Sequence, residues 1–151
     1  MAVEPPRERR EVRILALDVG SKRTGLAVSD PLGITAQGIG VLTPRDRGEL
    51  LAQLLEVARK WQVQRVVVGL PRHLDGRLGD AAPGILELAK DLEEALGVRV
   101  VTWDERLTTA EAERVLLQAD LSRRRRRQVL DQQAAVLILT NYLDYCQQHG
   151  D

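Results

Sequence analysis

Apolar and polar residues alternate with two different periods along the chain, and the two periods predict its secondary structure. Apolar residues recur at helical spacing in four segments, which are 46–61, 80–96, 108–119 and 122–147. Shorter apolar runs predict β-strands near 13–18, 24–29, 34–42, 65–68 and 98–103. The runs at 65–68 and 98–103 are continuous, which is typical of strands that are buried on both faces.

Polar residues at the ends of the helical segments predict where the helices begin and end. Asp46 with Glu49, and Thr108 with Glu111, have the spacing of capping boxes at helix N-termini. Gly97 follows the last apolar residue of its segment, as a left-handed C-terminal cap does. The predicted order is therefore β-β-β-α-β-α-β-α-α.

This order of elements predicts an α/β fold. A meander of three strands followed by alternating helices and strands gives a mixed five-stranded sheet flanked by helices. The later strands are expected to be parallel, because they are joined by right-handed crossovers. We expect one domain over 12–147, a flexible tail at 1–11 and a frayed end at 148–151.

Composition narrows the classes of function. The 151 residues are 44% hydrophobic and contain no Phe, so aliphatic side chains form the core and stacking of bases on aromatic platforms is not expected. A net charge of zero argues against a protein that works by bulk attraction to polyanions, but it allows a local basic patch. The lone Cys146 excludes an intrachain disulfide and a cysteine zinc cluster. No signal-peptide core or membrane span is visible, and we expect a cytoplasmic protein.

The first predicted hairpin carries an acid where its first strand ends. The apolar run 14–17 stops at Asp18, and Gly20 and Gly25 then bracket a polar turn. An acid at such a point is held rigidly by the strand and can still reach a ligand. The structural alternative is that Asp18 only caps the turn.

Two further features fall at the ends of predicted parallel strands, where ligands bind in open α/β sheets. They are the loop that begins Gly69-Leu70-Pro71, and the pair Asp104-Glu105. Carboxylates that converge on one edge repel each other unless a cation lies between them. Mg²⁺ suits such a site, and two ions about 4 Å apart support phosphodiester hydrolysis. Either Asp104 or Glu105 can be the second ligand.

A third acid, Asp131, lies on the last predicted helix. Ala135, Ile138 and Tyr142 lie at helical spacing from it, so this acid is on an otherwise apolar face. A buried carboxylate is costly unless it is paired or binds a metal. The alternative is an ion pair with Arg127 on the same face.

Basic residues flank these acids. Five arginines at 123–127 begin the last helix, where positive charge opposes the helix dipole. They form either a phosphate-binding patch or a solvated charged face. The same two interpretations apply to Lys22 and Arg23 in the first turn, while Arg106 can donate hydrogen bonds to phosphate.

With these pieces in place, the chain resembles the YqgF family, also called RuvX or Holliday-junction-resolvase-like, of the ribonuclease H superfold. The resemblance rests on four motifs in the family's order, which are the segments 16–30, 68–71 with Asp75-Gly76, 103–109, and 131–135 with 138–139. It implies a metal-dependent nuclease that uses Mg²⁺ or Mn²⁺ and acts on the 5′ end of the 16S rRNA precursor.

The resemblance also implies roles for individual residues. Asp18, Glu105 and Asp131 match the family's catalytic and metal-binding acids. Other superfold members carry an acid at the end of the fourth strand, where this chain has Gly69, so Glu105 takes that place. The residues expected to contact nucleic acid are all basic, and they are Lys22, Arg23, Arg106, Arg123, Arg124 and Arg127.

Three other functions stay open beside cleavage of RNA. The same chemistry could resolve branched DNA, for which junction symmetry requires a dimer. A sugar-kinase or actin-like ATPase shares the Asp-x-Gly hairpin but needs two such domains. A non-catalytic RNA-binding protein could keep the fold. Ribosomal particles are possible partners, and the sequence does not choose between a monomer and a homodimer.

Overall fold

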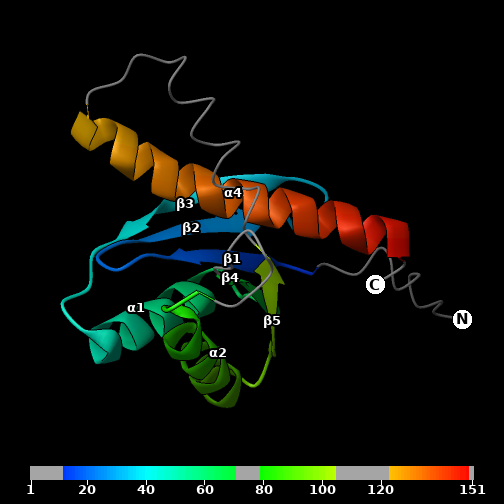
Figure 1. The fold of residues 1–151 in the computed structure, drawn as a ribbon. Helices are drawn as coiled ribbons and strands as arrows, with labels where there is room; N and C mark the ends of the chain where they lie inside the picture. The colour runs from blue at the N-terminus through cyan, green and yellow to red at the C-terminus, as the bar shows by residue number, and fades with distance from the viewer. Residues whose placement is uncertain (1–11, 71–78, 105–122, 150–151) are drawn as a thin grey trace, which may run out of the picture.

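The fold is built on a five-stranded mixed sheet with helices on both faces (Figure 1). The computed structural model describes residues 12–70, 79–104 and 123–149, without the side chains of 123–131. The strands are β1 (Ile14–Val19), β2 (Thr24–Ser29), β3 (Ala36–Leu42), β4 (Arg65–Leu70) and β5 (Arg99–Asp104). The helices are α1 (Arg47–Lys60), α2 (Ala82–Leu96) and α4 (Arg123–His149).

The strand order is β3-β2-β1-β4-β5, which confirms the predicted mixed sheet. β1 pairs antiparallel with β2 and parallel with β4, and β4 pairs parallel with β5. β2 and β3 are antiparallel, with a bulge at Leu26/Ala27. The two central strands, β1 and β4, therefore run in the same direction and end at the same edge of the sheet.

Two cores lie on opposite faces of this sheet. Helices α1 and α2 cover one face, where Leu15, Leu17 and Val68 belong to the α1/α2 core. Helix α4 crosses the other face, where Ile14 and Ala16 belong to the α4 core (Figure 1). Successive residues of β1 thus enter different cores, as the alternation of side chains along a strand requires.

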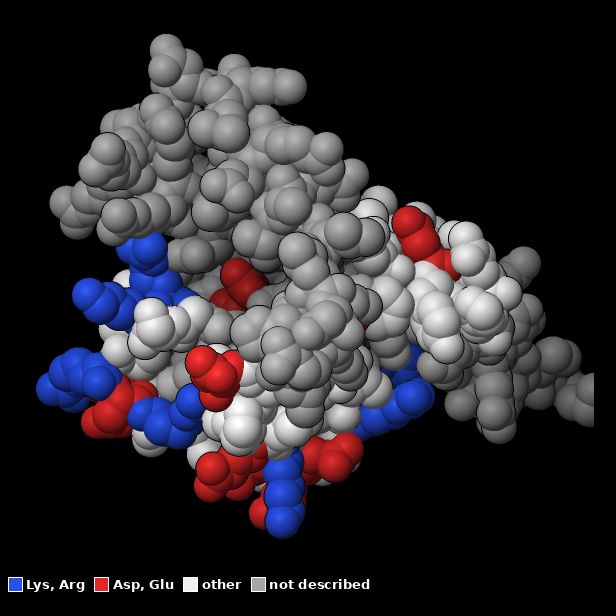
Figure 2. Space-filling model, viewed as in Figure 1, with Lys and Arg blue, Asp and Glu red and all other residues white. Residues whose placement is uncertain are grey.

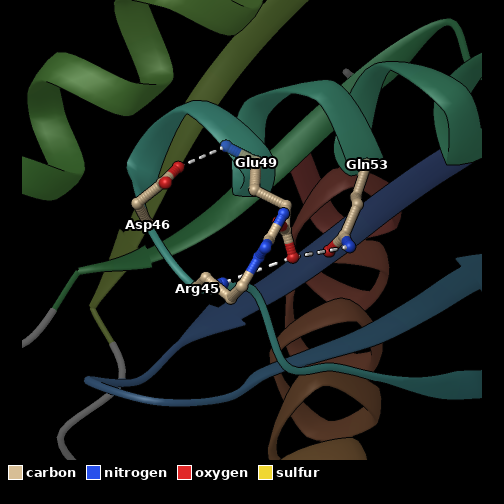
Figure 3. A network of polar contacts seen from close by, with 4 residues as sticks. All are labelled: Arg45, Asp46, Glu49 and Gln53. Atoms are coloured by element: carbon tan, nitrogen blue, oxygen red, sulfur yellow. Dashed lines mark hydrogen bonds and ion pairs between the residues drawn. The ribbon is translucent and has the colours of Figure 1, made fainter.

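The N-terminus of α1 is capped as predicted (Figure 3). The backbone N–H of Glu49 donates to Asp46 Oδ1 at 2.8 Å. The Glu49 carboxylate does not complete the box, because it accepts from Arg45 Nε at 2.7 Å and from Arg45 N at 3.3 Å. The expected Asp46 cap is therefore present. The Glu49 side chain, however, bonds the backbone N–H of Arg45, the residue before the cap, instead of the N–H of Asp46 itself.

The structure corrects one predicted strand and extends others. The segment 98–103 is only partly buried, because β5 is the edge strand and none of its residues is fully buried. β4 continues through Gly69 to Leu70, beyond the predicted 65–68. α4 continues to His149, and Gly97 takes the predicted left-handed conformation at φ 68°. The predicted helix 108–119 lies outside the described residues.

Two other sequence-based expectations concern the apolar parts of the chain. Cys146, which was expected to form no intrachain disulfide, is a free cysteine buried in the α4 core. Within 12–70, 79–104 and 123–149, no helix combines the length and hydropathy that crossing a membrane demands.

The C-terminus of α1 carries backbone strain. Gln62 has φ 52°, and it is the one non-glycine residue with positive φ among those described. The reversal closes the helix, since Val63 N donates to Ala58 O at 2.9 Å and Gln62 N donates to Arg59 O at 3.2 Å. Glycine adopts this conformation without the steric cost that a side chain brings.

Gln62→Gly is therefore expected to raise the free energy of unfolding by about 1 kcal/mol, because it removes left-handed strain. Urea unfolding of the variant and the parent measures the change. Gly97→Ala is the matched control, since it introduces a side chain at φ 68° and should lower stability by a similar amount. A less stable Gln62→Gly protein would show that the glutamine side chain contributes more than the strain costs.

Asp30 organises the turn between β2 and β3. Its Oδ1 accepts hydrogen bonds from the backbone N–H groups of Ile34 and Thr35, both at 2.7 Å, and Leu32 N donates to Oδ2 at 3.3 Å. The slight burial of the carboxyl raises its pKa, but the bonds from Thr35, Ile34 and Leu32 outweigh that effect. The net pKa of Asp30 is lowered below 3.8.

Because the folded-state pKa of Asp30 is lowered, its charge stabilises the fold above the unfolded-state value and stops doing so as pH falls through the folded-state value. Asp30→Asn keeps an acceptor but removes the charge. It should cost about 1 kcal/mol at neutral pH and progressively less between about pH 4 and pH 2. Urea unfolding across this pH range tests the prediction, and a cost independent of pH would contradict it.

Candidate active site

Asp18 lies at the edge of the sheet where β1 and β4 end. It pairs with Gly25 of β2 and is half-buried. By strand alternation it shares the face of Ile14 and Ala16, which is the face that α4 covers. The strand therefore holds this carboxylate on the α4 side of the sheet, at a point where solvent can still reach it.

The turn between β1 and β2 brings two of the predicted basic residues to the same edge. Gly20 N donates to Arg23 O at 2.7 Å, and this closes the turn directly after β1. A Cβ atom on Gly20 would lie 2.8 Å from the same oxygen, so the turn requires glycine. Lys22 is exposed and Arg23 is half-buried in this turn. Both cations thus follow Asp18 at the end of its strand.

Gly69 of β4 lies next to Asp18 of β1 in the sheet and contributes no side chain. Leu17 pairs with Val68 and Gly69 pairs with Trp103, so Asp18, Gly69 and Trp103 form one row across β1, β4 and β5. Val67 and Trp103 both pack in the α4 core, which places Gly69 on the same face as Asp18. The sequence indicated the loop after β4, but not this role of Gly69, which depends on the register of the strands.

The same alternation separates Asp104 from Asp18. Val100 packs against the α1/α2 core, whereas Val101 and Trp103 pack in the α4 core. Asp104 is exposed and has the phase of Val100, so it lies on the opposite face from Asp18. Of the two acids considered as the second ligand, Asp104 is thereby disfavoured. Glu105 lies outside the described residues.

Helix α4 brings its N-terminal turns toward this edge. Its first turns extend beyond the sheet on the side of the β1–β2 turn (Figure 1). Gln132 lies against Gly38 of β3, where a Cβ atom would lie 2.5 Å from Gln132 Nε2 and 2.6 Å from its Cγ. Gly38 thus permits a close approach of α4 to the sheet at Gln132, the residue that follows Asp131.

Not all predicted site residues are described. Asp18, Lys22 and Arg23 are brought together at the end of β1. Helix α4 contains four further predicted residues, of which the structure describes the backbone but not the side chains: Arg123, Arg124, Arg127 and Asp131. Glu105 and Arg106 lie outside it entirely. Among the described residues, no three His, Cys, Asp or Glu side chains cluster as metal ligands.

The seat of α4 on β3 gives a testable prediction. Gly38→Ala should destabilise the protein by about 1–2 kcal/mol, because its methyl group would overlap the Gln132 side chain. Combining it with Gln132→Ala should restore most of this loss, since the two residues share one contact. A double-mutant cycle by urea unfolding measures the coupling. Additive effects of the two substitutions would show that Gly38 acts through the backbone alone.

Comparison with solved structures defines the class of fold. T. thermophilus RuvC in complex with a Holliday junction substrate has a TM-score of 0.60 and 19% identity, over 91% of this chain and 96% of that chain. The fowlpox virus Holliday junction resolvase has a TM-score of 0.57 and 14% identity, over 89% and 99% of the two chains. The fold is therefore RNase H-like, as predicted.

Sequence comparison then gives the family. The model of the RuvX family, described as Holliday junction resolvase, matches residues 12–145. A protein of Moorella thermoacetica named "Putative pre-16S rRNA nuclease" is 52% identical over 92% of this chain and 99% of its own length. A protein of the same name from Listeria monocytogenes is 45% identical over 88% and 98%. The chain belongs to the RuvX family, and it is a nuclease, a hydrolase of phosphodiester bonds.

Proposed function

We propose that this nuclease hydrolyses phosphodiester bonds in the precursor of 16S rRNA, near its 5′ end. The relatives from Moorella and Listeria carry the name of that activity. The structural observation that carries the proposal is the half-buried Asp18 on the α4 face, in the same row across the sheet as Gly69, which contributes no side chain. Such a precursor would place the protein in the cytoplasm, and the substrate could be an assembling ribosomal particle.

The proposed catalytic acids are Asp18, Glu105 and Asp131. Carboxylate oxygens are suitable ligands for Mg²⁺ or Mn²⁺. The carboxylate of Asp18 is half-buried at the end of β1, where solvent can reach it. Bound divalent ions would lower the pKa of the attacking water and stabilise the leaving oxygen. Glu105 is the preferred second ligand because Asp104, the other candidate, has the phase of the face opposite Asp18.

The basic residues have a separate role in the proposal, which is to bind the backbone of the substrate. Lys22 and Arg23 follow the end of β1 and are close enough in the chain to meet phosphates on either side of the bond that Asp18 faces. Arg106, Arg123, Arg124 and Arg127 are proposed to extend this contact. Phosphate contacts of this kind position the substrate without reading its sequence.

The second candidate function is cleavage of branched DNA. It is favoured by the description of the family model and by the fold shared with RuvC and the fowlpox resolvase. Symmetric cleavage of a junction would require a dimer with two sites. A homodimer would thus accompany the DNA function, whereas a monomer suffices for cleavage of RNA.

Purified protein should be incubated with a labelled 16S precursor fragment and, separately, with a synthetic four-way DNA junction, in Mg²⁺, Mn²⁺ or EDTA. We expect metal-dependent cleavage of the RNA. Asp18→Asn should lower its rate about 100-fold or more, because several kcal/mol of transition-state stabilisation are lost. Gel analysis of the products measures both rates.

Asp104→Asn is the matched control, because Asp104 carries the same functional group at the same edge but on the other face. Its activity should stay within about twofold of the parent, whereas Glu105→Gln should be as inactive as Asp18→Asn. Full activity of Asp18→Asn would refute the proposed acid site. Cleavage of the junction alone would favour the second function.

A further inference from the structure

A basic cavity lies at the opposite end of β1 from Asp18. Its volume is about 260 Å³, and it opens to the surface where β1 begins and α1 ends. The residues that line it come from three short segments of the chain, and they are Arg13, Pro31, Lys60, Trp61, Gln62 and Gln64.

The lining of this cavity is chemically one-sided. It contains a guanidinium from Arg13, an ammonium from Lys60 and two carboxamides from Gln62 and Gln64, with no carboxylate. On the face that Figure 2 shows, by contrast, acidic and basic side chains are intermixed over the surface of α1 and α2. A cavity that joins two cations and two amides is suited to a compact anion with acceptors on several sides.

The walls of the cavity are fixed by the fold. The Arg13 guanidinium lies over the Trp61 ring, 5.5 Å from its centroid. Gln64 N donates to Arg13 O at 2.8 Å, and Val12 N donates to Pro31 O at 3.0 Å. The backbone around the cavity is thus already ordered, so that binding of a ligand costs little backbone conformational entropy.

Gln62 provides an independent observation. It is the residue held at φ 52°, a conformation in which glycine would be less strained. The strain places a carboxamide, rather than a bare backbone, in the wall of the cavity. Strained residues of this kind are concentrated at ligand sites.

The cavity is separate from the candidate active site. Arg13 precedes Asp18 by five positions on an extended strand, which corresponds to about 17 Å. Arg13 also has the phase of Leu15, which packs in the α1/α2 core, so the cavity opens on the other face of the sheet from Asp18. One phosphate group cannot touch both places.

We propose that this cavity binds a backbone phosphate of the RNA substrate, several nucleotides away from the bond that is cleaved. The inference rests on the proposed function, because it takes the bound polyanion to be RNA. A nuclease with no net charge needs local contacts of this kind to hold a polyanion. The volume accommodates a phosphate group together with water molecules, each of which takes about 30 Å³.

The test uses the indole N–H signals in a ¹⁵N-correlated NMR spectrum of the whole chain. The protein has two tryptophans, and Trp103 packs against Tyr142 and Tyr145 on the α4 side, in the row of Asp18, so its signal reports RNA at the candidate active site whereas the Trp61 signal reports the cavity. Trp103→Phe assigns the signals. The ligands are a single-stranded RNA 12-mer, a 12-residue poly-glutamate and inorganic phosphate, all in EDTA, so that no metal-dependent cleavage occurs during the titration.

RNA should shift the Trp61 signal in a saturable manner, at concentrations where poly-glutamate does not. Inorganic phosphate should shift the same signal only at much higher concentration, because it lacks the additional contacts that the rest of an RNA strand makes with the protein. An unmoved Trp61 signal while RNA binds, or an equal response to poly-glutamate, would overturn the inference. A response to phosphate but not to RNA would assign the cavity to a free anion and would also overturn it.

Lys60→Gln and Arg59→Gln form the matched pair of variants. Both remove one positive charge from the last turn of α1, but only Lys60 lines the cavity. Lys60→Gln should weaken RNA binding about three- to fivefold and lower the salt slope by about 0.7, whereas Arg59→Gln should leave the Trp61 shift intact. Equal effects of the two substitutions would contradict a specific site.

This outcome is independent of the cleavage experiment. If Asp18→Asn abolishes cleavage while the Trp61 signal ignores RNA, the nuclease proposal stands and the cavity proposal fails. If neither RNA nor DNA is cleaved but RNA shifts Trp61, the cavity is an RNA contact and the catalytic proposal fails.

Discussion

The constraint on which the rest of this structure depends is the alternation of side chains along β1. Leu15 and Leu17 enter the α1/α2 core, and Ile14 and Ala16 enter the α4 core, so the strand is buried on both faces. A slip of one residue would exchange every one of these side chains between two cores of different shape. The same alternation places Asp18 on the α4 face, so the packing of its neighbours in the strand determines the face of the sheet on which this acid lies.

The α4 core explains how a helix can complete a site that a strand begins. Ala16 and Ala27 are fully buried under α4, and Gly38 accepts Gln132, so small residues on three adjacent strands let the helix lie close to the sheet. Dense packing of this kind leaves a helix little freedom to slide. Its N-terminal turns are thereby directed toward the edge where β1 ends, which is where the proposed third acid is needed.

The sequence predicted the parts of the fold that depend on local patterns. The strand 24–29, the Asp46 cap and the Gly97 C-cap are each determined by residues close together in the chain, and all three are confirmed. The predicted burial of 98–103 was wrong, because an apolar run does not reveal which strand has no neighbour on one side. For the site, the sequence predicted Asp18 as a catalytic acid and the structure gives its place at the end of β1, whereas the positions of Gly69 and Asp104 depend on register between strands, which no single motif encodes.

The ends of β1 also show why a local rule can fail at a place that matters for binding. At the carboxyl end, Gly20 obeys the expected rule, because a tight turn with no room for a Cβ atom carries glycine. At the amino end, Gln62 breaks the corresponding rule for a helix that ends in the left-handed conformation. A glycine there would improve the fold and remove a carboxamide from the wall of the basic cavity. The retained strain is therefore explained if the cavity binds a ligand, and stability alone does not account for it.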